Sequence, residues 1–205
     1  MLYIIDYGSG NLRSVQKAFE HVGVPADVGS DVERIMSADG LVLPGVGAFG
    51  AAMEELEARG LVDPIRERVL ARVPFLGVCL GLQLLFERSE EAPGIAGLGL
   101  VPGDVRRIPE RVKVPHMGWN QIELMADSDL FEGVPDHTAF YFVHSYVVVP
   151  VRPGDVLTTT DYGDFTFVSG VQTGSLAAFQ FHPEKSSSLG LRIYRNFAAR
   201  VAAGA

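Results

Sequence analysis

The first half of the chain alternates short apolar runs with segments whose apolar residues recur at helical spacing. The runs predict strands at 2–6, 26–28, 40–43 and 75–78. The spaced segments predict helices at 12–22, 51–59 and 64–73, and another that starts at residue 80. Strands and helices that alternate with short connections are typical of a parallel sheet covered on both faces.

The second half has a different pattern, in which aromatic and β-branched residues dominate and Gly, Pro and Asp mark turns. It predicts strands at 101–108, 114–124, 139–149, 156–160, 165–171 and 175–181. Leu189, Ile193, Phe197 and Val201 then follow at intervals of four and predict a closing helix. We expect an α/β fold, with a mostly parallel sheet flanked by helices and antiparallel strands added in the C-terminal half.

The chain of 205 residues contains no internal repeat and no linker-like segment. Its length suits one domain with an elaborated region, so we expect residues 1–205 to form a single domain. The net charge of −8 argues against a general nucleic-acid binder. The basic cluster at 106–113 is better explained as a solvated loop than as a phosphate site.

Three features bear on location. A single cysteine cannot form an internal disulfide. The N-terminal apolar run lacks a basic segment before it and is better explained as a strand than as a signal peptide. The longest mostly apolar stretch, 75–86, is too short to span a bilayer. These features predict a soluble cytoplasmic protein without membrane contact.

The cysteine itself, Cys79, lies in Gly77-Val-Cys-Leu-Gly81, between a predicted strand and a predicted helix. A cysteine in a strand-to-helix turn with small flanking residues is typical of a nucleophile elbow. The start of a helix also favours the thiolate form. Considered alone, Cys79 could equally be a small buried hydrophobic residue.

A histidine and a carboxylate follow another apolar strand, in Phe181-His182-Pro183-Glu184. Residues two apart at the end of a strand point to the same side. His182 is therefore a candidate acid and base for the Cys79 thiol, with Glu184 as the group that orients its ring. A lone histidine there would more simply be a core or capping residue, but the elbow cysteine in the same chain favours the catalytic interpretation.

Acyl chemistry at a thiolate also needs donors for an oxyanion. The loop Gly45-Val46-Gly47 follows the 40–43 strand, and its glycines let backbone N–H groups approach a substrate. The N–H of Leu80, directly after the nucleophile, is the second candidate donor. Neither this loop nor 8–11 carries a complete phosphate-binding or dinucleotide-binding motif. The histidines are too dispersed for a metal site, so we expect no metal and no cofactor.

These residues resemble the class I, triad-type glutamine amidotransferases over nearly the whole chain. The matching segments are 77–83, 44–47 and 181–186. Segments 5–12, 116–120 and 141–146 further resemble the glutaminase subunits of imidazole glycerol phosphate synthases. The resemblance implies that Cys79, with His182 and Glu184, hydrolyses glutamine to glutamate and ammonia through a thioester.

The resemblance also implies a substrate pocket and a partner. Residues that would contact glutamine are Gln83, Glu91, His144, Ser145 and Tyr146. Glu90 is an alternative to Glu91. The implied partner is a (β/α)8 barrel cyclase subunit, which receives the ammonia in histidine biosynthesis. Candidate interface residues are Asn11, His116, Met117, Trp119 and Asn120.

Two alternatives remain open from the sequence. The chain could supply ammonia to another pathway, such as pyridoxal phosphate or anthranilate synthesis, or it could be a non-catalytic subunit on the same scaffold. We also expect the Gly45–Gly47 loop to hold an unproductive peptide orientation until a partner or ligand selects the productive one.

Overall fold

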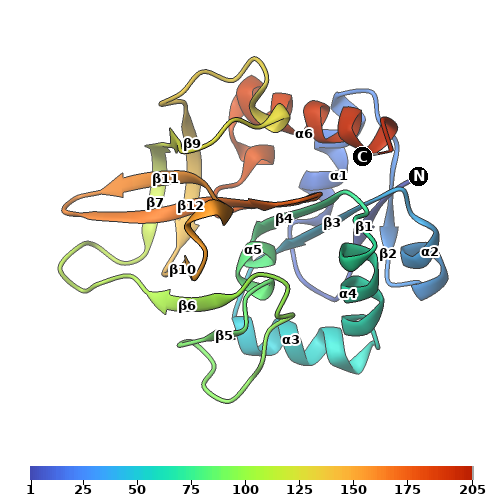
Figure 1. Ribbon diagram of the computed structural model, residues 1–205, viewed down its shortest axis with the longest axis horizontal. Helices are drawn as coiled ribbons and strands as arrows, with labels where there is room; N and C mark the ends of the chain where they lie inside the picture. The colour runs from blue at the N-terminus through green and yellow to red at the C-terminus, as the bar shows by residue number, and fades with distance from the viewer. Residues whose placement is uncertain (205) are drawn as a thin grey trace.

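The computed structural model describes residues 1–204, which are built around one large mixed sheet (Figure 1). This sheet contains 11 strands, nine of them in the order β2-β1-β3-β4-β13-β12-β10-β6-β5. A second sheet pairs two further strands, β7 and β9. The expected α/β architecture is confirmed, because the parallel strands lie on one side of the large sheet and the antiparallel strands on the other.

The parallel part consists of five adjacent strands. They are β2 (Ala26–Gly29), β1 (Leu2–Ile5), β3 (Gly40–Gly45), β4 (Phe75–Cys79) and β13 (Leu176–Phe179). Every residue of β1, β3, β4 and β13 is buried. Continuous apolar strands are expected where helices cover both faces of a parallel sheet.

These strands separate two hydrophobic cores, and helices cover the sheet on both faces (Figure 1). Alternate residues of β1 divide between the cores, with Ile4 in one and Ile5 in the other. The first core includes residues of α1 and α6, and the second includes residues of α2 to α5. Their bounds are α1 (Leu12–His21), α2 (Val32–Ser37), α3 (Phe49–Ala58), α4 (Val62–Leu70), α5 (Leu80–Leu84) and α6 (Ser187–Ala202).

The antiparallel extension is drawn mostly on the left of Figure 1. In the large sheet it contains β12 (Phe165–Thr173), β10 (Tyr146–Pro150), β6 (Gly103–Arg107), β11 (Val156–Tyr162) and β8 (Glu123–Leu124). The two-residue strand β5 (Arg88–Ser89) pairs parallel to β6 at the edge. The second sheet joins β7 (His116–Gln121) to β9 (Ala139–His144). Three short 3-10 helices complete the chain, η1 (Asp129–Phe131), η2 (Pro153–Asp155) and η3 (Pro183–Lys185).

Two predicted strands differ from the structure. The strand expected at 139–149 is divided at Ser145 into β9 and β10, which belong to different sheets, and 114–124 likewise gives β7 and β8. The short helix α2 was not predicted. It begins after Asp31, whose side chain accepts hydrogen bonds from the backbone N–H groups of Glu33 and Arg34.

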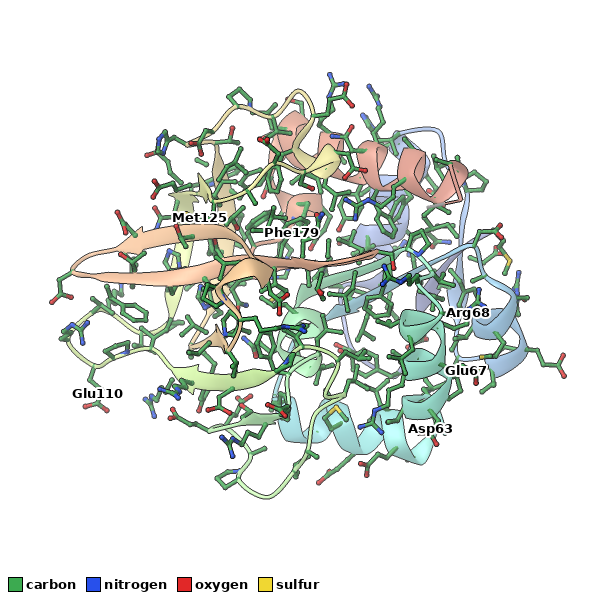
Figure 2. The ribbon with its side chains drawn as sticks, viewed as in Figure 1. Asp63, Glu67, Arg68, Glu110, Met125 and Phe179 are labelled. Atoms are coloured by element: carbon green, nitrogen blue, oxygen red, sulfur yellow. The ribbon has the colours of Figure 1, made fainter. Side chains whose placement is uncertain are left out.

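The carboxyl ends of β1, β3, β4 and β13 lie at one edge of the sheet, where open α/β sheets place their ligand sites. Figure 2 shows Phe179, at the end of β13, among the side chains in the interior, whereas Asp63, Glu67 and Glu110 project outward. Within residues 1–204, no helix combines the length and apolar character needed to cross a membrane.

Candidate active site

Cys79 ends β4 immediately before α5 and has the backbone angles φ 54° and ψ −108°. A non-glycine residue rarely adopts a positive φ, and such strain costs about 1–3 kcal/mol. The flanking glycines are required by the space around them. A Cβ at Gly77 would lie 2.9 Å from the Cβ of Ala178, and a Cβ at Gly81 would lie 1.8 Å from the Leu43 carbonyl oxygen. The turn therefore has the tight geometry of a nucleophile elbow.

The turn places Cys79 at a cavity of about 380 Å³. The cavity lies between the ends of the parallel strands and the start of the antiparallel extension. Its lining comes from widely separated segments of the chain: Val46, Gly47, Cys79, Leu80, Gln83, Glu91, Pro115, Val143, His144, Ser145 and Tyr146. Most residues that the sequence nominated for catalysis or substrate binding thus share one cavity.

His182 and Glu184 form a buried pair beside this cavity. The Nδ1 atom of His182 lies 2.7 Å from Oε1 of Glu184, and neither side chain is exposed to solvent. The local geometry differs from the predicted strand, because β13 ends at Phe179 and Glu184 lies in the 3-10 helix η3. The turn, not strand alternation, brings the two side chains together. The backbone N–H of His182 donates to the Tyr141 carbonyl and anchors the pair to β9.

Glu184 is held by two further donors. Its Oε1 accepts a hydrogen bond from the Asn11 amide, and its Oε2 accepts one from the Tyr194 hydroxyl at 3.0 Å. Burial raises the pKa of Glu184, but the hydrogen bond and charge of His182, together with Asn11, outweigh this and lower it overall. Glu184 therefore remains a carboxylate that stabilises a charged His182.

His182 shows the complementary effect. Burial lowers its pKa, but the proximity of Cys79 and the hydrogen bond and charge of Glu184 outweigh this and raise the pKa to about 9. Its second ring nitrogen, Nε2, is buried and has no hydrogen-bond partner within residues 1–204. The imidazole thus has one nitrogen fixed by Glu184 and the other available for proton exchange at the cysteine.

The backbone of the Gly45–Gly47 loop is held by hydrogen bonds to the side chain of Ser9. The Val46 N–H donates to the Ser9 hydroxyl at 2.9 Å, and that hydroxyl lies 3.0 Å from the Val46 carbonyl oxygen. The Val46 N–H is therefore occupied and does not act as an oxyanion donor in this conformation. Gly47, with φ 111°, lines the cavity, while Gly45 packs against the Tyr7 hydroxyl and does not line it.

Leu80 meets the requirement for the second oxyanion donor. It is the first residue of α5, so its N–H has no acceptor within the helix. It also lines the cavity next to Cys79. The structure thus places one candidate donor, the Leu80 N–H, beside Cys79 and holds the other, the Val46 N–H, in a separate hydrogen bond.

The candidate substrate-binding residues line the cavity, and some of their polar groups already make hydrogen bonds within the protein. Gln83 Nε2 donates both to the Tyr146 carbonyl at 3.2 Å and to Gln180 Oε1 at 3.1 Å. Because both protons are used, only Oε1 of Gln83 remains to accept a bond from a substrate. Glu91 Oε2 accepts from the Phe49 N–H at 2.8 Å, at the start of α3.

Glu90, the alternative to Glu91, is directed elsewhere. Its Oε2 accepts from the Arg107 N–H at 2.8 Å, so its carboxylate is turned toward β6. Glu91 lines the cavity and Glu90 does not. The geometry favours Glu91 as the cavity carboxylate.

His144 and His116 form a second buried pair, joined by a contact of 2.9 Å between His116 Nδ1 and His144 Nε2. His144 Nδ1 lies 2.9 Å from the Tyr146 carbonyl and must donate to it, so His144 Nε2 accepts from His116. Burial lowers the pKa of His116 to about 4 and that of His144 to about 3. Both rings are neutral near pH 7, and each is confined to one tautomer.

The candidate interface residues on β7 point to opposite faces of the strand, because side chains alternate along it. Met117 and Trp119 are 62% and 56% exposed, so Trp119 is a surface residue and not part of the core. His116 is buried under Phe142, Tyr162 and Phe167, and the structure therefore does not place it on the exposed face. Asn120 is half-buried and hydrogen-bonds to the Asp161 carbonyl.

Four residues near the site were not singled out from the sequence. Ser9 holds Val46, Tyr194 holds Glu184, and Gln180 contacts the Cys79 sulfur. Tyr7 has a buried hydroxyl without a hydrogen-bond partner in the described part of the chain, and burial raises its pKa. Tyr7 and Ser9 lie in segment 5–12, whose resemblance to known glutaminase subunits assigned them no individual role, and Gln180 and Tyr194 are single polar residues in apolar segments. Only the position of Gln180 two residues before His182 could have directed attention to it.

Comparison with known proteins identifies the family. Residues 3–201 match the family model for glutamine amidotransferase class I. The chain belongs to the class I glutamine amidotransferases. It is 53% identical over 198 residues to the imidazole glycerol phosphate synthase subunit HisH of Moorella thermoacetica, covering 97% of this chain and 94% of that protein. It is also 53% identical over 195 residues to the HisH protein of Aquifex aeolicus, covering 95% and 94%.

Solved structures of amidotransferases share the fold at lower identity. A structure described as a glutamine amidotransferase aligns with a TM-score of 0.75 and 22% identity, covering 98% of both chains. A glutamine amidotransferase from Thermotoga maritima aligns with a TM-score of 0.70 and 16% identity, covering 98% of this chain and 96% of that one. The scaffold of this amidotransferase is therefore shared well beyond its close sequence relatives.

Proposed function

We propose that this chain is the glutaminase subunit of an imidazole glycerol phosphate synthase, which hydrolyses glutamine and supplies ammonia for histidine biosynthesis. The observation that carries the proposal is the strained Cys79 at the cavity, beside the buried His182–Glu184 pair. The name shared by relatives about 53% identical to this chain supports the assignment to that synthase.

In the proposed reaction, the Cys79 thiolate attacks the amide carbon of glutamine, and a carbon–sulfur bond forms. A proton from His182 goes to the leaving nitrogen as the carbon–nitrogen bond breaks and ammonia departs. A pKa of about 9 keeps His182 protonated at neutral pH, which suits this donation. Water then attacks the thioester, His182 takes its proton, and glutamate leaves as the thiolate re-forms.

Glutamine binding is assigned to the opposite side of the cavity. The unused Gln83 Oε1 accepts a hydrogen bond from the substrate, and the Glu91 carboxylate faces its ammonium group. Ser145 and Tyr146 complete the wall at the break between β9 and β10. This arrangement fixes the substrate by its polar ends and leaves the amide at Cys79.

The proposed partner is a barrel-shaped cyclase whose docking face includes the exposed Met117 and Trp119 side chains and the segment that contains Asn11. Tryptophan and methionine are enriched at protein interfaces. Asn11 contacts Glu184, and the adjoining Ser9 holds Val46. A partner on this face would therefore touch the segment that restrains the glycine loop, which supports activation of the glutaminase by its partner.

The experiment combines labelling with substitution. A glutamine-analogue electrophile should modify Cys79 in the wild-type chain, located by peptide mass spectrometry. Cys79→Ser should remove labelling and lower glutamate release by at least roughly 1,000-fold in the assembled synthase, with an unchanged far-UV circular dichroism spectrum and unchanged partner binding.

Two results would overturn the proposal at different levels. Substantial glutamate release by Cys79→Ser would refute the thiolate mechanism. Labelling at Cys79 together with ammonia transfer only to a different synthase would keep the chemistry and reject the pathway. Ser14→Ala, an exposed change on α1, is the matched control and should leave both readouts unchanged.

A further inference from the structure

Gln180 is a buried amide that contacts the proposed nucleophile. Its side chain is fully excluded from solvent, and its Nε2 lies 3.7 Å from the Cys79 sulfur, within hydrogen-bond range for sulfur. Its backbone N–H donates to the Ser169 carbonyl at 2.8 Å, which fixes the residue beyond the end of β13. The amide therefore approaches the sulfur from the protein interior and not from the cavity.

The orientation of this amide is determined by its neighbours. Gln83 Nε2 donates to Gln180 Oε1 at 3.1 Å, and Gln83 is itself held by the Tyr146 carbonyl. Since Tyr146 offers only an acceptor, Gln83 must present its NH₂ group on that side. Reversing Gln180 would then bring two NH₂ groups together. The hydrogen-bond network accordingly turns the Gln180 NH₂ group toward sulfur.

We propose that Gln180 is a further catalytic residue, which donates an N–H hydrogen bond to the Cys79 thiolate and holds it for attack. A hydrogen bond to an ionised group is stronger than one to a neutral group. The donor would therefore stabilise the thiolate before attack and again when the thioester breaks and negative charge returns to sulfur. The inference rests on the proposed function of Cys79 as nucleophile.

The test measures thiol reactivity directly, so it does not depend on glutamine turnover. Rates of Cys79 alkylation by iodoacetamide are recorded from pH 5 to 9 for the wild type, Gln180→Met and Gln180→Glu. Methionine removes the donor at similar size. Glutamate keeps an acceptor for Gln83 but presents an oxygen to sulfur. Gln172→Met, in β12 and hydrogen-bonded to Ser128, is the matched control away from the site.

We expect Gln180→Met to raise the pH midpoint of alkylation by about half to one unit, so that alkylation near pH 6 slows roughly 3- to 10-fold. Gln180→Glu should raise the midpoint further, because an acceptor or a negative charge then faces the thiolate. Gln172→Met should leave the midpoint unchanged. His182 and Tyr7 are the titratable groups that interact with Cys79, and both are retained in every variant.

Unchanged midpoints in both Gln180 variants would overturn the inference. If neither variant folds, the side-chain amide resonances of Gln180 in the wild type provide the test. Their chemical shifts should change with pH at the same midpoint as alkylation. Chemical shifts that stay constant over this pH range would refute the proposed hydrogen bond from Gln180 to the thiolate. A failure of the proposed function is distinguishable, because it would appear as glutamate release by Cys79→Ser whatever the alkylation profile.

Discussion

The Cys79 elbow and the Gly45–Gly47 loop end neighbouring strands, and Gly45 pairs directly with Cys79 in the sheet. They are held by different forces. The elbow is fixed by close packing, since neither flanking glycine has space for a Cβ. The loop is held by two hydrogen bonds between Val46 and the Ser9 hydroxyl.

This difference separates a permanent part of the active site from an adjustable one. Moving the elbow would require the sheet and α5 to separate, at a cost comparable to the stability of the domain. Releasing Val46 from Ser9 exchanges hydrogen bonds worth about 1 kcal/mol each. The proposed nucleophile, Cys79, is therefore preorganised, whereas a modest binding energy suffices to release the proposed oxyanion donor, the Val46 N–H.

A substitution that disrupts the packing of the Cys79 elbow should have the largest effect in free energy. Gly81→Ala places a Cβ 1.8 Å from the Leu43 carbonyl oxygen, which is backbone and cannot move aside. We expect a loss of at least about 3 kcal/mol in the free energy of unfolding, measured by urea denaturation. Gly154→Ala is the control, since no atom lies within 4 Å of its Cβ. Equal stability of the two variants would contradict the packing account of the elbow.

The buried pair of His116 and His144 is a second part of the site that is fixed by burial, and His144 lines the cavity. His144 has a pKa of about 3 in the folded chain and an ordinary value near 6.5 when unfolded. The contribution of His144 to the free energy of unfolding is therefore fully present above pH 6.5. Below pH 6.5 the unfolded state takes up the proton, and the free energy of unfolding falls by about 1.4 kcal/mol per pH unit. His116, with a pKa of about 4, adds to the slope until that pH.

The measurement is urea unfolding between pH 7 and 5. His144→Gln should lower the stability at pH 7 but reduce its dependence on pH in this interval. His21→Gln, an exposed change at the end of α1, should retain the wild-type slope. An unchanged slope in His144→Gln would show that His144 already accepts a proton in the folded protein.

A substitution that frees the Gly45–Gly47 loop from Ser9 should have the smallest effect in free energy. Ser9→Ala removes both hydrogen bonds that hold Val46 and should raise glutamate release by the isolated chain about fivefold, the equivalent of about 1 kcal/mol. The rate in the complex should change less, because under the proposed activation the partner would already select the productive loop. A lower rate in the isolated chain would mean that Ser9 supports the productive loop instead.

The layers of the fold followed from the sequence because apolar runs and helical spacing report burial directly. What the pattern could not show was which strands join which sheet. Segment 139–149 is continuous in composition, yet the chain changes sheets at Ser145. The short helix α2 depends on its Asp31 cap more than on periodicity.

The site followed from the sequence where backbone constraints leave a motif. Gly77 and Gly81 are visible because only glycine fits there. Ser9, Gln180 and Tyr194 act through single hydrogen bonds to residues far away in the chain, and such contacts leave no local pattern. The resemblance of segment 116–120 places His116 with Met117 and Trp119 among the candidate interface residues, although strand alternation turns His116 inward.

The most direct measurement is glutamate release from glutamine by the purified chain, alone and with the proposed cyclase partner and its nucleotide ligand. A preset elbow with a restrained loop predicts little hydrolysis alone and strong stimulation in the complex, and Cys79→Ser should abolish it in both cases. Full activity in the isolated chain, with no further stimulation by the partner, would contradict the restraint that Ser9 places on Val46.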